Sequence, residues 1–349
     1  MGGNRHYAQR VRGPPAGRSA TGHAAKMKTS TIGYGLISLL VVAVFTSAAL
    51  AQDADQQSFS FEFEGHQRTY SLHIPDDVQG AAPLVFVLHG RGGTGQQMRA
   101  YTGFDAVADE AGFIVAYPDG INGEWNYVRG IPGYPNTHDD TAFLVALTNE
   151  IALTQPVDLS RVYITGFSNG GFMAQRAACD DPARFAAFAS VGAAGFGGMP
   201  RICPAIGEIP SPMLLMHGTD DRIVPWDGES VTRGDQTVFI TYPVPETFGF
   251  WAAHNGCAAN AETTDLPQLG LSPQTSVRTL EVDCPDNASV VLYAIIGGGH
   301  NWPGQPDGIP AQIAGNVSLD IDASRVIWAF FEPHHSAQPE TETTPEAAG

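Results

Sequence analysis

Lysine is almost absent from this 349-residue sequence. The only two, Lys26 and Lys28, lie near the N-terminus, before the point where we expect an export signal to be cleaved. A mature chain without lysine cannot form a Schiff base with a carbonyl substrate or pyridoxal phosphate, and it lacks the lysine with which a P-loop binds phosphate. Enzymes that depend on a Schiff-base lysine, on pyridoxal phosphate or on a P-loop are thereby excluded.

Positive charge is scarce as well. Residues 1–51 contain six basic and no acidic side chains, so the remainder carries 12 basic against 36 acidic side chains and a formal charge of −24. A surface of this sign repels nucleic-acid phosphates and anionic lipid headgroups. We expect no nucleic-acid partner and no stable membrane association once the signal is removed.

Metal-binding motifs are missing too. The sequence has neither an Asp/Asn-rich calcium loop nor a His-Glu-x-x-His pair. The adjacent His334 and His335 stand at the start of a segment rich in Pro, Glu and Thr, which favours a solvated tail over a metal site. We expect neither a metal nor an organic cofactor.

Only one long apolar run is present, at residues 32–50. It follows Met27-Lys28, is interrupted by glycine, serine and threonine, and ends in the small-x-small pattern ALA at residues 49–51. It is shorter than the roughly 20 apolar residues of a membrane span, although an uncleaved anchor is the alternative. We therefore expect residues 1–51 to be an upstream segment plus a signal peptide, residues 52–333 a single catalytic domain, and residues 334–349 a disordered acidic tail. The protein would be secreted, either outside the cell or into a periplasm.

The four cysteines fit export, because an even number in a secreted chain is what disulfides require. Three connectivities are possible. We favour Cys179 with Cys203 and Cys257 with Cys284, since each pair closes a short loop within one half of the chain. Buried free thiols are the alternative.

The hydrophobic pattern indicates an α/β fold. Phenylalanines at 59, 61 and 63, followed by alternating apolar residues at 70–74, predict an antiparallel N-terminal hairpin. Apolar runs at 83–88, 113–117, 162–165, 185–191, 213–216 and 290–296 are typical of strands buried on both faces. Helix-length segments at 139–154 and 169–179 alternate with them, and 317–331 should form a closing helix that directs Val317, Ile321, Val326, Ile327 and Phe330 to the core. We expect a mostly parallel central sheet with helices on both faces.

The strongest chemical signal is GFSNGG at residues 166–171, directly between a predicted strand and a predicted helix. This context is typical of a nucleophile elbow, in which small residues two before and two after the serine make room for a strained turn. An ordinary glycine-rich turn is the alternative. We predict that Ser168 is a nucleophile.

A serine hydroxyl needs a base, and the base needs an acceptor that fixes its tautomer. His300 follows the predicted strand 290–296 on a loop of three glycines, which favours it as the base. The segment HGTDDRIVP at 217–225 follows strand 213–216, so Asp220 and Asp221 are both candidate acids and their spacing does not separate them. We expect His217 only to form hydrogen bonds within this segment.

Two backbone N–H groups should hold the oxyanion, one of them on Asn169 directly after the serine. The segment HGRGG at 89–93 follows strand 83–88 and would supply the other from Arg91. Glycines at 90, 92 and 95 also match the dinucleotide-binding fingerprint, so a Rossmann-type oxidoreductase is a competing interpretation. It leaves the serine, acid and histidine motifs unexplained.

Six blocks in order resemble the polyhydroxybutyrate depolymerase and feruloyl esterase family of secreted α/β-hydrolases over about residues 58–331. They are LHGRGG at 88–93, YPDG at 117–120 with WN at 125–126, DD at 139–140, GFSNGG at 166–171, HGTDD at 217–221 with VP at 224–225, and GGHNWPG at 298–304. The resemblance implies the α/β-hydrolase fold, selects Asp221 as the acid and implies the same cysteine pairing.

These residues predict a serine carboxylic-ester hydrolase that acts through an acyl-enzyme. The resemblance implies feruloyl or acetyl esters of plant cell-wall polysaccharide such as xylan, or short hydroxyalkanoate esters, as substrates. Trp125, Trp226 and Trp302 would line a groove for a phenolic acyl group or a sugar face, or else belong to the core. A serine peptidase of the same fold and a catalytically silent carbohydrate-binding relative are the alternatives.

Overall fold

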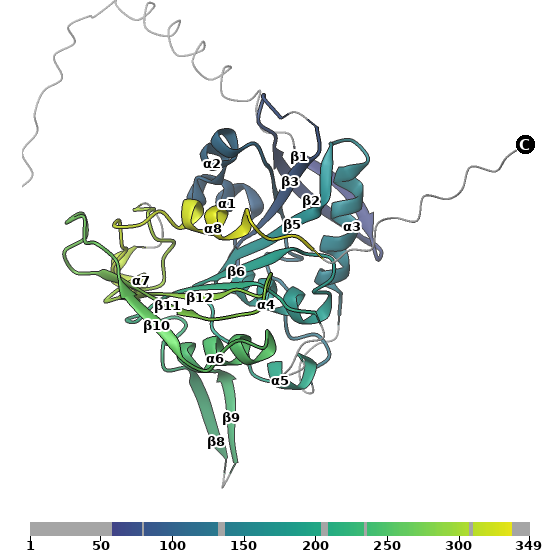
Figure 1. The fold of residues 1–349 in the computed structure, drawn as a ribbon. Coiled ribbons are helices and arrows are strands. Elements are labelled where there is room, and N and C mark those ends of the chain that lie inside the picture. Colours follow the sequence, from purple (N-terminus) through teal and green to yellow (C-terminus); the bar gives the residue numbers. More distant parts are fainter. Residues whose placement is uncertain are drawn as a thin grey trace, which may run out of the picture. The chain divides into compact units, whose positions relative to one another are not determined.

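A ten-stranded sheet runs through the computed structural model, which describes residues 58–78, 80–131, 137–203, 209–233, 236–306 and 310–336 (Figure 1). All of these residues belong to the unit Ala54–Gly349. The strand order is β1-β2-β4-β3-β5-β6-β7-β12-β11-β10. The bounds are β1 Ser58–Phe63, β2 His66–His73, β3 Ala82–Leu88, β4 Ile114–Pro118, β5 Val157–Phe167, β6 Ala187–Val191, β7 Met213–Gly218, β10 Ala261–Asp265, β11 Ser276–Val282 and β12 Val290–Ile296.

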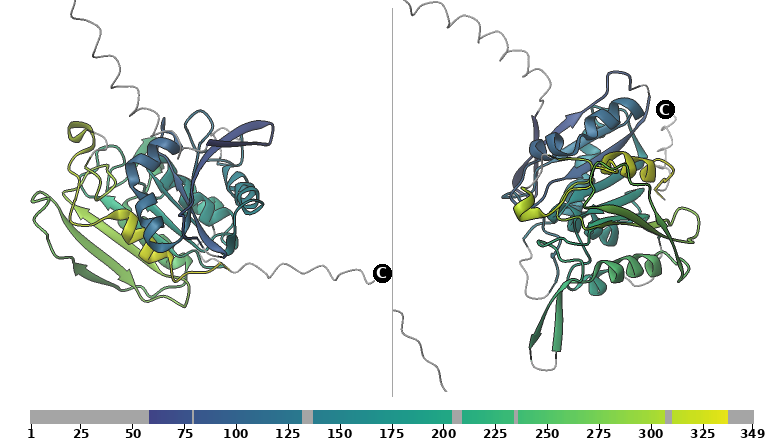
Figure 2. Two further views of the ribbon diagram at one scale, coloured as in Figure 1. Left: turned by 90° about the horizontal axis from the view of Figure 1, so that it is seen from above. Right: turned by 90° about the vertical axis from the view of Figure 1, so that its left-hand side faces the viewer.

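The six central strands, from β4 to β12, are parallel. They are apolar on both faces because both are covered. In β3, Leu84, Phe86 and Leu88 belong to one core cluster and Val85 and Val87 to the other. The first layer includes α3 (Asp140–Ala152), α4 (Asn169–Asp180) and α6 (Val244–His254), and the second α1 (Gly95–Thr102), α2 (Phe104–Ala111) and α8 (Ala323–Phe331) (Figure 2). The predicted α/β-hydrolase architecture is confirmed.

Both edges of the sheet are antiparallel. The predicted N-terminal hairpin is present as β1 and β2, and β2 pairs antiparallel with β4. At the other edge β11 and β10 continue the sheet, and a separate hairpin of β8 (Glu229–Arg233) and β9 (Gln236–Thr241) projects from the body in Figures 1 and 2. The sequence did not predict these four strands.

The predicted closing helix is wrong in its first half. Helix α8 begins at Ala323, because the side chain of Asp322 accepts hydrogen bonds from the backbone N–H groups of Ser324 and Arg325 and so caps the helix there. The buried face is therefore Ala323, Ser324, Ile327, Trp328 and Phe331, and Val317 and Ile321 precede the helix. The short helices α5 (Met199–Ile202) and α7 (Ala311–Ala314) complete the set of described helices.

The predicted boundary of the C-terminal tail is also wrong, because residues 334–336 pack against the body. His334 is only 5% exposed, and its backbone carbonyl accepts a hydrogen bond from the Tyr163 hydroxyl at 2.9 Å. Its Nδ1 lies 3.0 Å from Asn287 Oδ1, and Ser336 N–H donates to Ser160 O at 2.8 Å.

The expected tail beyond residue 336 and the expected signal segment 1–51 lie outside the described residues. Within the described ranges, no helix combines the length and apolarity that a membrane crossing needs.

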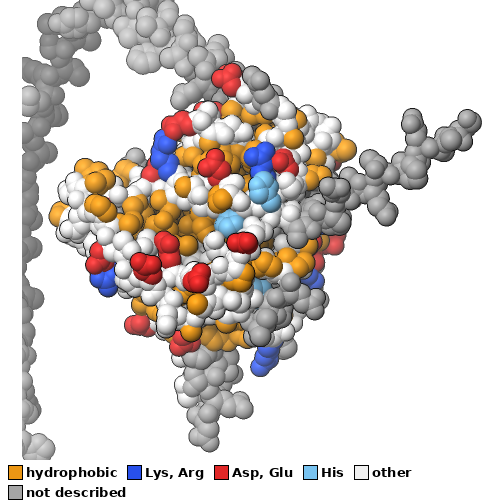
Figure 3. Space-filling model, in the orientation of Figure 1, with side chains coloured by type: hydrophobic (Ala, Val, Ile, Leu, Met, Phe, Trp, Pro, Cys, Tyr) orange, Lys and Arg blue, Asp and Glu red, His pale blue; other side chains and the backbone are white. Residues whose placement is uncertain are grey.

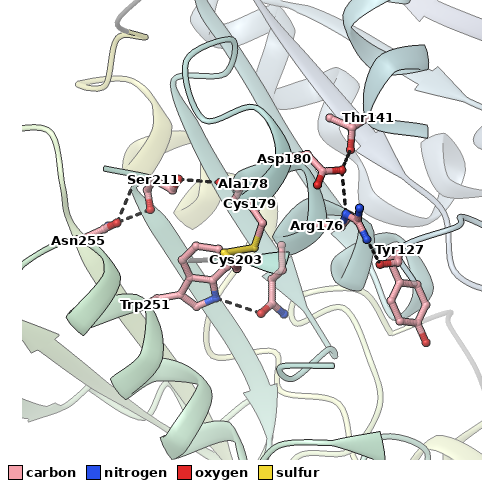
Figure 4. Close-up of a disulfide and its surroundings, with 11 residues drawn as sticks. Tyr127, Thr141, Arg176, Ala178, Cys179, Asp180, Cys203, Ser211, Trp251 and Asn255 are labelled. Carbon is pink, nitrogen blue, oxygen red and sulfur yellow. Dashed lines mark hydrogen bonds and ion pairs between the residues drawn. A yellow bond between two sulfur atoms is a disulfide. The ribbon is translucent and has the colours of Figure 1, made fainter. Parts of the chain in front are cut away.

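Both favoured disulfides are present. Cys179 is joined to Cys203, and Cys257 to Cys284. The first joins the C-terminal part of α4 to the residue that ends α5. Figure 4 shows Cys179 next to Arg176 and Asp180 on the same helix, where Arg176 bonds Asp180 Oδ2 at 2.8 Å and Tyr127 O at 3.1 Å. Helix α4, which begins directly after Ser168, is thus fixed at its far end.

Candidate active site

Ser168 occupies a strained turn between β5 and α4. Its backbone has φ 54° and ψ −115°, outside the range that a serine normally adopts, and its N–H donates to Val191 O of β6 at 2.8 Å. Close packing explains the flanking glycines: a Cβ on Gly166 would lie 2.4 Å from the Gly170 carbonyl carbon, and one on Gly170 would lie 2.4 Å from Leu88 O. The predicted elbow geometry is therefore present.

Asp221 and His300 form a buried pair. His300 Nδ1 lies 2.7 Å from Asp221 Oδ2, and the two residues are 2% and 5% exposed. The other oxygen, Oδ1, accepts hydrogen bonds from the backbone N–H groups of Ile223 and Val224, each at 2.8 Å. These two donors fix the carboxylate, and its other oxygen, Oδ2, faces Nδ1 of the imidazole.

His300 is held in place through both its backbone and its ring. Its backbone N–H donates to Ala314 O at 2.6 Å, and its ring lies 4.7 Å from the ring of Phe167, the residue before Ser168. On another side is Gly192, with φ +62°, where an added Cβ would lie 3.3 Å from His300 Cε1. The serine, acid and histidine thus follow β5, β7 and β12, whose carboxyl ends meet at one edge of the sheet.

His217 sits behind this pair. It is 2% exposed, its Nε2 lies 2.8 Å from Val224 O, and the same nitrogen is 3.4 Å from Asp221 Oδ2. Burial lowers the pKa of His217, which keeps the ring neutral beside His300. Its hydrogen bond to the acid loop agrees with the expectation for this residue.

The two backbone N–H groups predicted to bind the oxyanion have no backbone acceptor among the described residues. Asn169 is the first residue of α4, so its N–H has no acceptor within the helix. In the loop after β3, Gly92 N–H donates to Gly123 O at 2.7 Å and Gly93 N–H to Gly90 O at 3.0 Å, which leaves the N–H of Arg91 for a ligand. Gly90 brings this loop to Ser168, because a Cβ on Gly90 would lie 3.5 Å from Ser168 Cβ. The Arg91 side chain is exposed and lies 3.5 Å from Glu124.

The same contacts argue against a dinucleotide site. Gly90 packs beside Ser168 and Gly95 against Tyr117, and the N–H groups of Gly92 and Gly93, which would face a pyrophosphate, are bonded to backbone carbonyls. Thr94 caps α1 through its own side chain. The loop serves the serine, and the competing fingerprint is a coincidence of spacing.

His89 fastens this oxyanion loop to residues 119–126. Its Nε2 accepts a hydrogen bond from Gly120 N–H at 2.9 Å, so Nδ1 carries the proton and donates to Gly90 O at 2.7 Å. Burial lowers the pKa of His89 and so maintains this neutral form. Apart from the family blocks, no sequence pattern singles out residues 119–126.

Two of the three tryptophans proposed for substrate binding belong to the interior. Trp302 is fully buried, packs against Phe104, and donates its Nε1–H to Ser324 Oγ. Trp125 is 2% exposed and donates its Nε1–H to His89 O at 3.0 Å. The burial of both rings favours the alternative that these two tryptophans belong to the core. Trp226 is partly exposed, with its ring 6.1 Å from that of His217, and it remains a candidate.

Comparisons with known proteins point the same way. The family described as "Esterase PHB depolymerase" matches residues 68–207. The chain is 30% identical over 251 residues to "Putative esterase NocK" of Nocardia uniformis subsp. tsuyamanensis, covering 69% of this chain and 72% of that protein. It is 30% identical over 272 residues to "Feruloyl esterase C" of Emericella nidulans, covering 76% and 83%. The fold is similar to that of the acetyl xylan esterase from Aspergillus awamori, with a TM-score of 0.54, 15% identity, and coverage of 79% of this chain and 99% of that one.

Proposed function

Since the chain belongs to the PHB depolymerase family of α/β-hydrolase esterases, we propose that it hydrolyses carboxylic esters through an acyl-enzyme formed on Ser168. The family membership makes it a carboxylic ester hydrolase. The observation that supports these residue roles best is the buried 2.7 Å contact between His300 and Asp221 at the sheet edge where the Ser168 elbow ends β5.

The reaction has two halves. Ser168 Oγ attacks the ester carbonyl carbon while His300 Nε2 takes the hydroxyl proton, and the imidazolium that forms is stabilised by Asp221. The N–H groups of Asn169 and Arg91 bind the negative oxygen of the tetrahedral intermediate. When the intermediate collapses, His300 gives the proton to the leaving alcohol. Water then attacks the acyl-enzyme by the same route and releases the acid.

The substrates we propose are feruloyl or acetyl esters of plant cell-wall polysaccharide, or short hydroxyalkanoate esters. The relative named feruloyl esterase C supports the first class, and the family description supports the last. Trp226 is the tryptophan with exposed surface for a phenolic ring or a sugar face. We also propose that the protein is exported, which the two disulfides and the apolar run at 32–50 support.

The test is turnover by purified residues 52–349 on methyl ferulate, acetylated xylan, hydroxybutyrate oligomers and short-chain nitrophenyl esters. We expect a clear preference within this panel, and loss of turnover on every ester in the Ser168→Ala variant. Full activity in that variant would exclude Ser168 as the nucleophile. Turnover of amides in preference to esters would instead indicate a peptidase.

A further inference from the structure

A buried ion pair lies beneath the segment that supports the oxyanion loop. We name residues 119–126 the brace loop; it connects β4 to the chain that leads into α3. Arg68 of β2 and Asp140, the first residue of α3, lie under its two ends and are 2% and 1% exposed. Neither residue touches Ser168 or His300.

The brace loop contacts both elements that carry the proposed oxyanion donors. On the Arg91 side, Gly120 N–H donates to His89 Nε2, Gly123 O accepts from Gly92 N–H, and Trp125 Nε1–H donates to His89 O. On the other side Trp125 N–H donates to Asn169 Oδ1 at 2.7 Å, and the Asn169 amide returns a bond to Trp125 O at 3.3 Å. Displacement of the brace loop would therefore move both donors.

The ion pair holds each end of the brace loop. Arg68 Nη2 bonds Asp140 Oδ1 at 2.9 Å and also donates to Asp119 O at 3.2 Å, at the start of the loop. Asp140 Oδ2 accepts from Asn126 N–H at 2.7 Å, at its end. The guanidinium is fixed in turn by the ring of Phe143, whose centroid lies 3.5 Å below it.

A buried ion pair of this kind is poorly explained as a source of stability. Removing two charges from water costs about as much as their attraction returns, and well-packed apolar residues in their place are often neutral or stabilising. The burial of Arg68 lowers its pKa, which reflects this cost. Apolar residues in these places could neither donate a hydrogen bond to Asp119 O nor accept one from Asn126 N–H.

We propose that Arg68 and Asp140 are positioning residues that set the geometry of the oxyanion hole through the brace loop. The inference rests on the proposed function, because it takes the N–H groups of Arg91 and Asn169 as the oxyanion donors. It makes a distinction that can be measured: transition-state stabilisation should depend on the pair, and ground-state binding should not.

The test compares two double variants of the whole protein. Arg68→Met with Asp140→Leu removes both anchors and leaves neither an unpaired arginine nor an unpaired aspartate; it also removes the carboxylate that lies 3.2 Å from His138 Nε2. Arg161→Met with Asp158→Leu removes a second Arg–Asp pair, 2.7 Å apart on β5, that does not touch the brace loop. We expect the first variant to lose about 10- to 100-fold in kcat with KM within about twofold, the size of effect that misplaced oxyanion donors produce. The second should match the wild type in both constants.

The decisive readout is inhibition by an aryl trifluoromethyl ketone, whose adduct with the serine places an oxyanion in the hole. Its affinity should fall by the same factor as kcat/KM in the first variant only. A folded variant with unchanged kcat and unchanged inhibition overturns the proposal. If the apolar pair does not fold, Arg68→Met with Asp140→Asn decides in its place, because it leaves no unpaired arginine and still removes the donor to Asp119 O.

The Ser168→Ala variant, measured alongside, distinguishes a failure of the proposed function from a failure of the positioning role. Activity that survives in Ser168→Ala would refute the proposed function itself. Activity that is lost in Ser168→Ala but unchanged in the Arg68/Asp140 variants would refute only the positioning role.

Discussion

The two oxygens of the Asp221 carboxylate have different partners, and replacing the carboxylate by an amide should disturb only one of these contacts. In Asp221→Asn the Ile223 and Val224 N–H groups can still hold Oδ1, so the side chain stays in place. Its NH₂ would then face His300 Nδ1 and force the proton onto Nε2, where the imidazole cannot accept the proton of Ser168. We expect kcat to fall by roughly 10³- to 10⁴-fold, measured on any ester that the wild type hydrolyses.

Asp220 provides the matched control for this substitution. Its backbone N–H bonds Gly298 O, a contact that a change of side chain preserves. Asp220→Asn should therefore keep kcat within about twofold, since no reacting group depends on its carboxylate. Equal losses at positions 220 and 221 would contradict the assignment of the acid.

Gly192 fixes the position of the His300 ring, and a single methyl group should disturb it. In Gly192→Ala the added carbon would lie 3.0 Å from Phe167 Cε2 and 3.3 Å from His300 Nδ1, at φ +62°. We expect kcat to fall at least tenfold and the free energy of unfolding to fall by about 1–2 kcal/mol, from thermal or denaturant melts.

Gly249 of α6 serves as the comparison, because an added Cβ there meets no atom within 4 Å. Gly249→Ala should raise the free energy of unfolding by about 0.5–1 kcal/mol and leave kcat unchanged. A Gly192→Ala enzyme with normal kcat would show that the histidine tolerates displacement.

At the scale of single residues, the sequence singles out most readily the positions that local motifs mark. Ser168 and His300 stand in glycine-rich turns directly after strands, so their neighbours in the chain identify them. The burial of Trp125 and Trp302 could not be predicted in this way, because it depends on helices and loops far away in the chain, such as Ser324 for Trp302. The Arg68–Asp140 contact joins positions 72 residues apart, and no local pattern indicates it.

At the scale of elements, residues 334–336 make the stability of the protein sensitive to acid. Burial lowers the pKa of His334 from 6.5 to about 4, with a smaller contribution from the charge of His335. Below pH 6.5 the unfolded chain binds a proton that the folded chain refuses, so folding loses free energy as the pH falls toward 4. We expect a loss of about 3 kcal/mol from this group by pH 4, in the free energy of unfolding measured against pH.

His334→Gln should flatten that profile by roughly one proton between pH 6.5 and 4. His66→Gln, which replaces an exposed histidine at the β1–β2 turn, should leave its slope as it is. A wild-type slope in His334→Gln would mean that residues 334–336 detach before the protein unfolds.

The two disulfides should contribute to stability and not to chemistry. They close chain segments of 24 and 27 residues, for which loop entropy gives about 3 kcal/mol each. Replacing either pair by alanine should lower the free energy of unfolding by that amount and leave kcat within about twofold. A tenfold drop in kcat for Cys179→Ala with Cys203→Ala, in a folded enzyme, would show that the anchoring of α4 reaches Ser168.

Element prediction succeeded where burial dictates composition. Strand β12 coincides with the predicted run 290–296, and the other central strands agree to within a few residues, because both faces must be apolar. Strand β10, with the sequence AETTD, is exposed along its whole length, so no hydrophobic period marks it. Its partner β11 (SVRTLEV) and strand β8 (ESVTR) also contain more polar than apolar residues.

At the scale of the whole molecule, the excess of acid should repel anionic substrates. Acidic side chains outnumber basic ones on the face shown in Figure 3, in keeping with 36 against 12 beyond residue 51. We expect kcat/KM for an ester that carries a free carboxylate to rise several-fold between 10 and 300 mM salt, because ions screen the repulsion. Its neutral methyl ester should show no such trend, and a falling rate for the anionic ester would indicate a local positive site.

The C-terminal attachment has a practical consequence. Ser336 is bonded to Ser160 near the start of β5, whereas Ser168 follows its end, about 25 Å away at the rise of a strand. An affinity tag or solid support linked after residue 336 would therefore leave from the end of the sheet opposite the catalytic serine. An immobilised enzyme attached this way presents its active edge to an insoluble substrate.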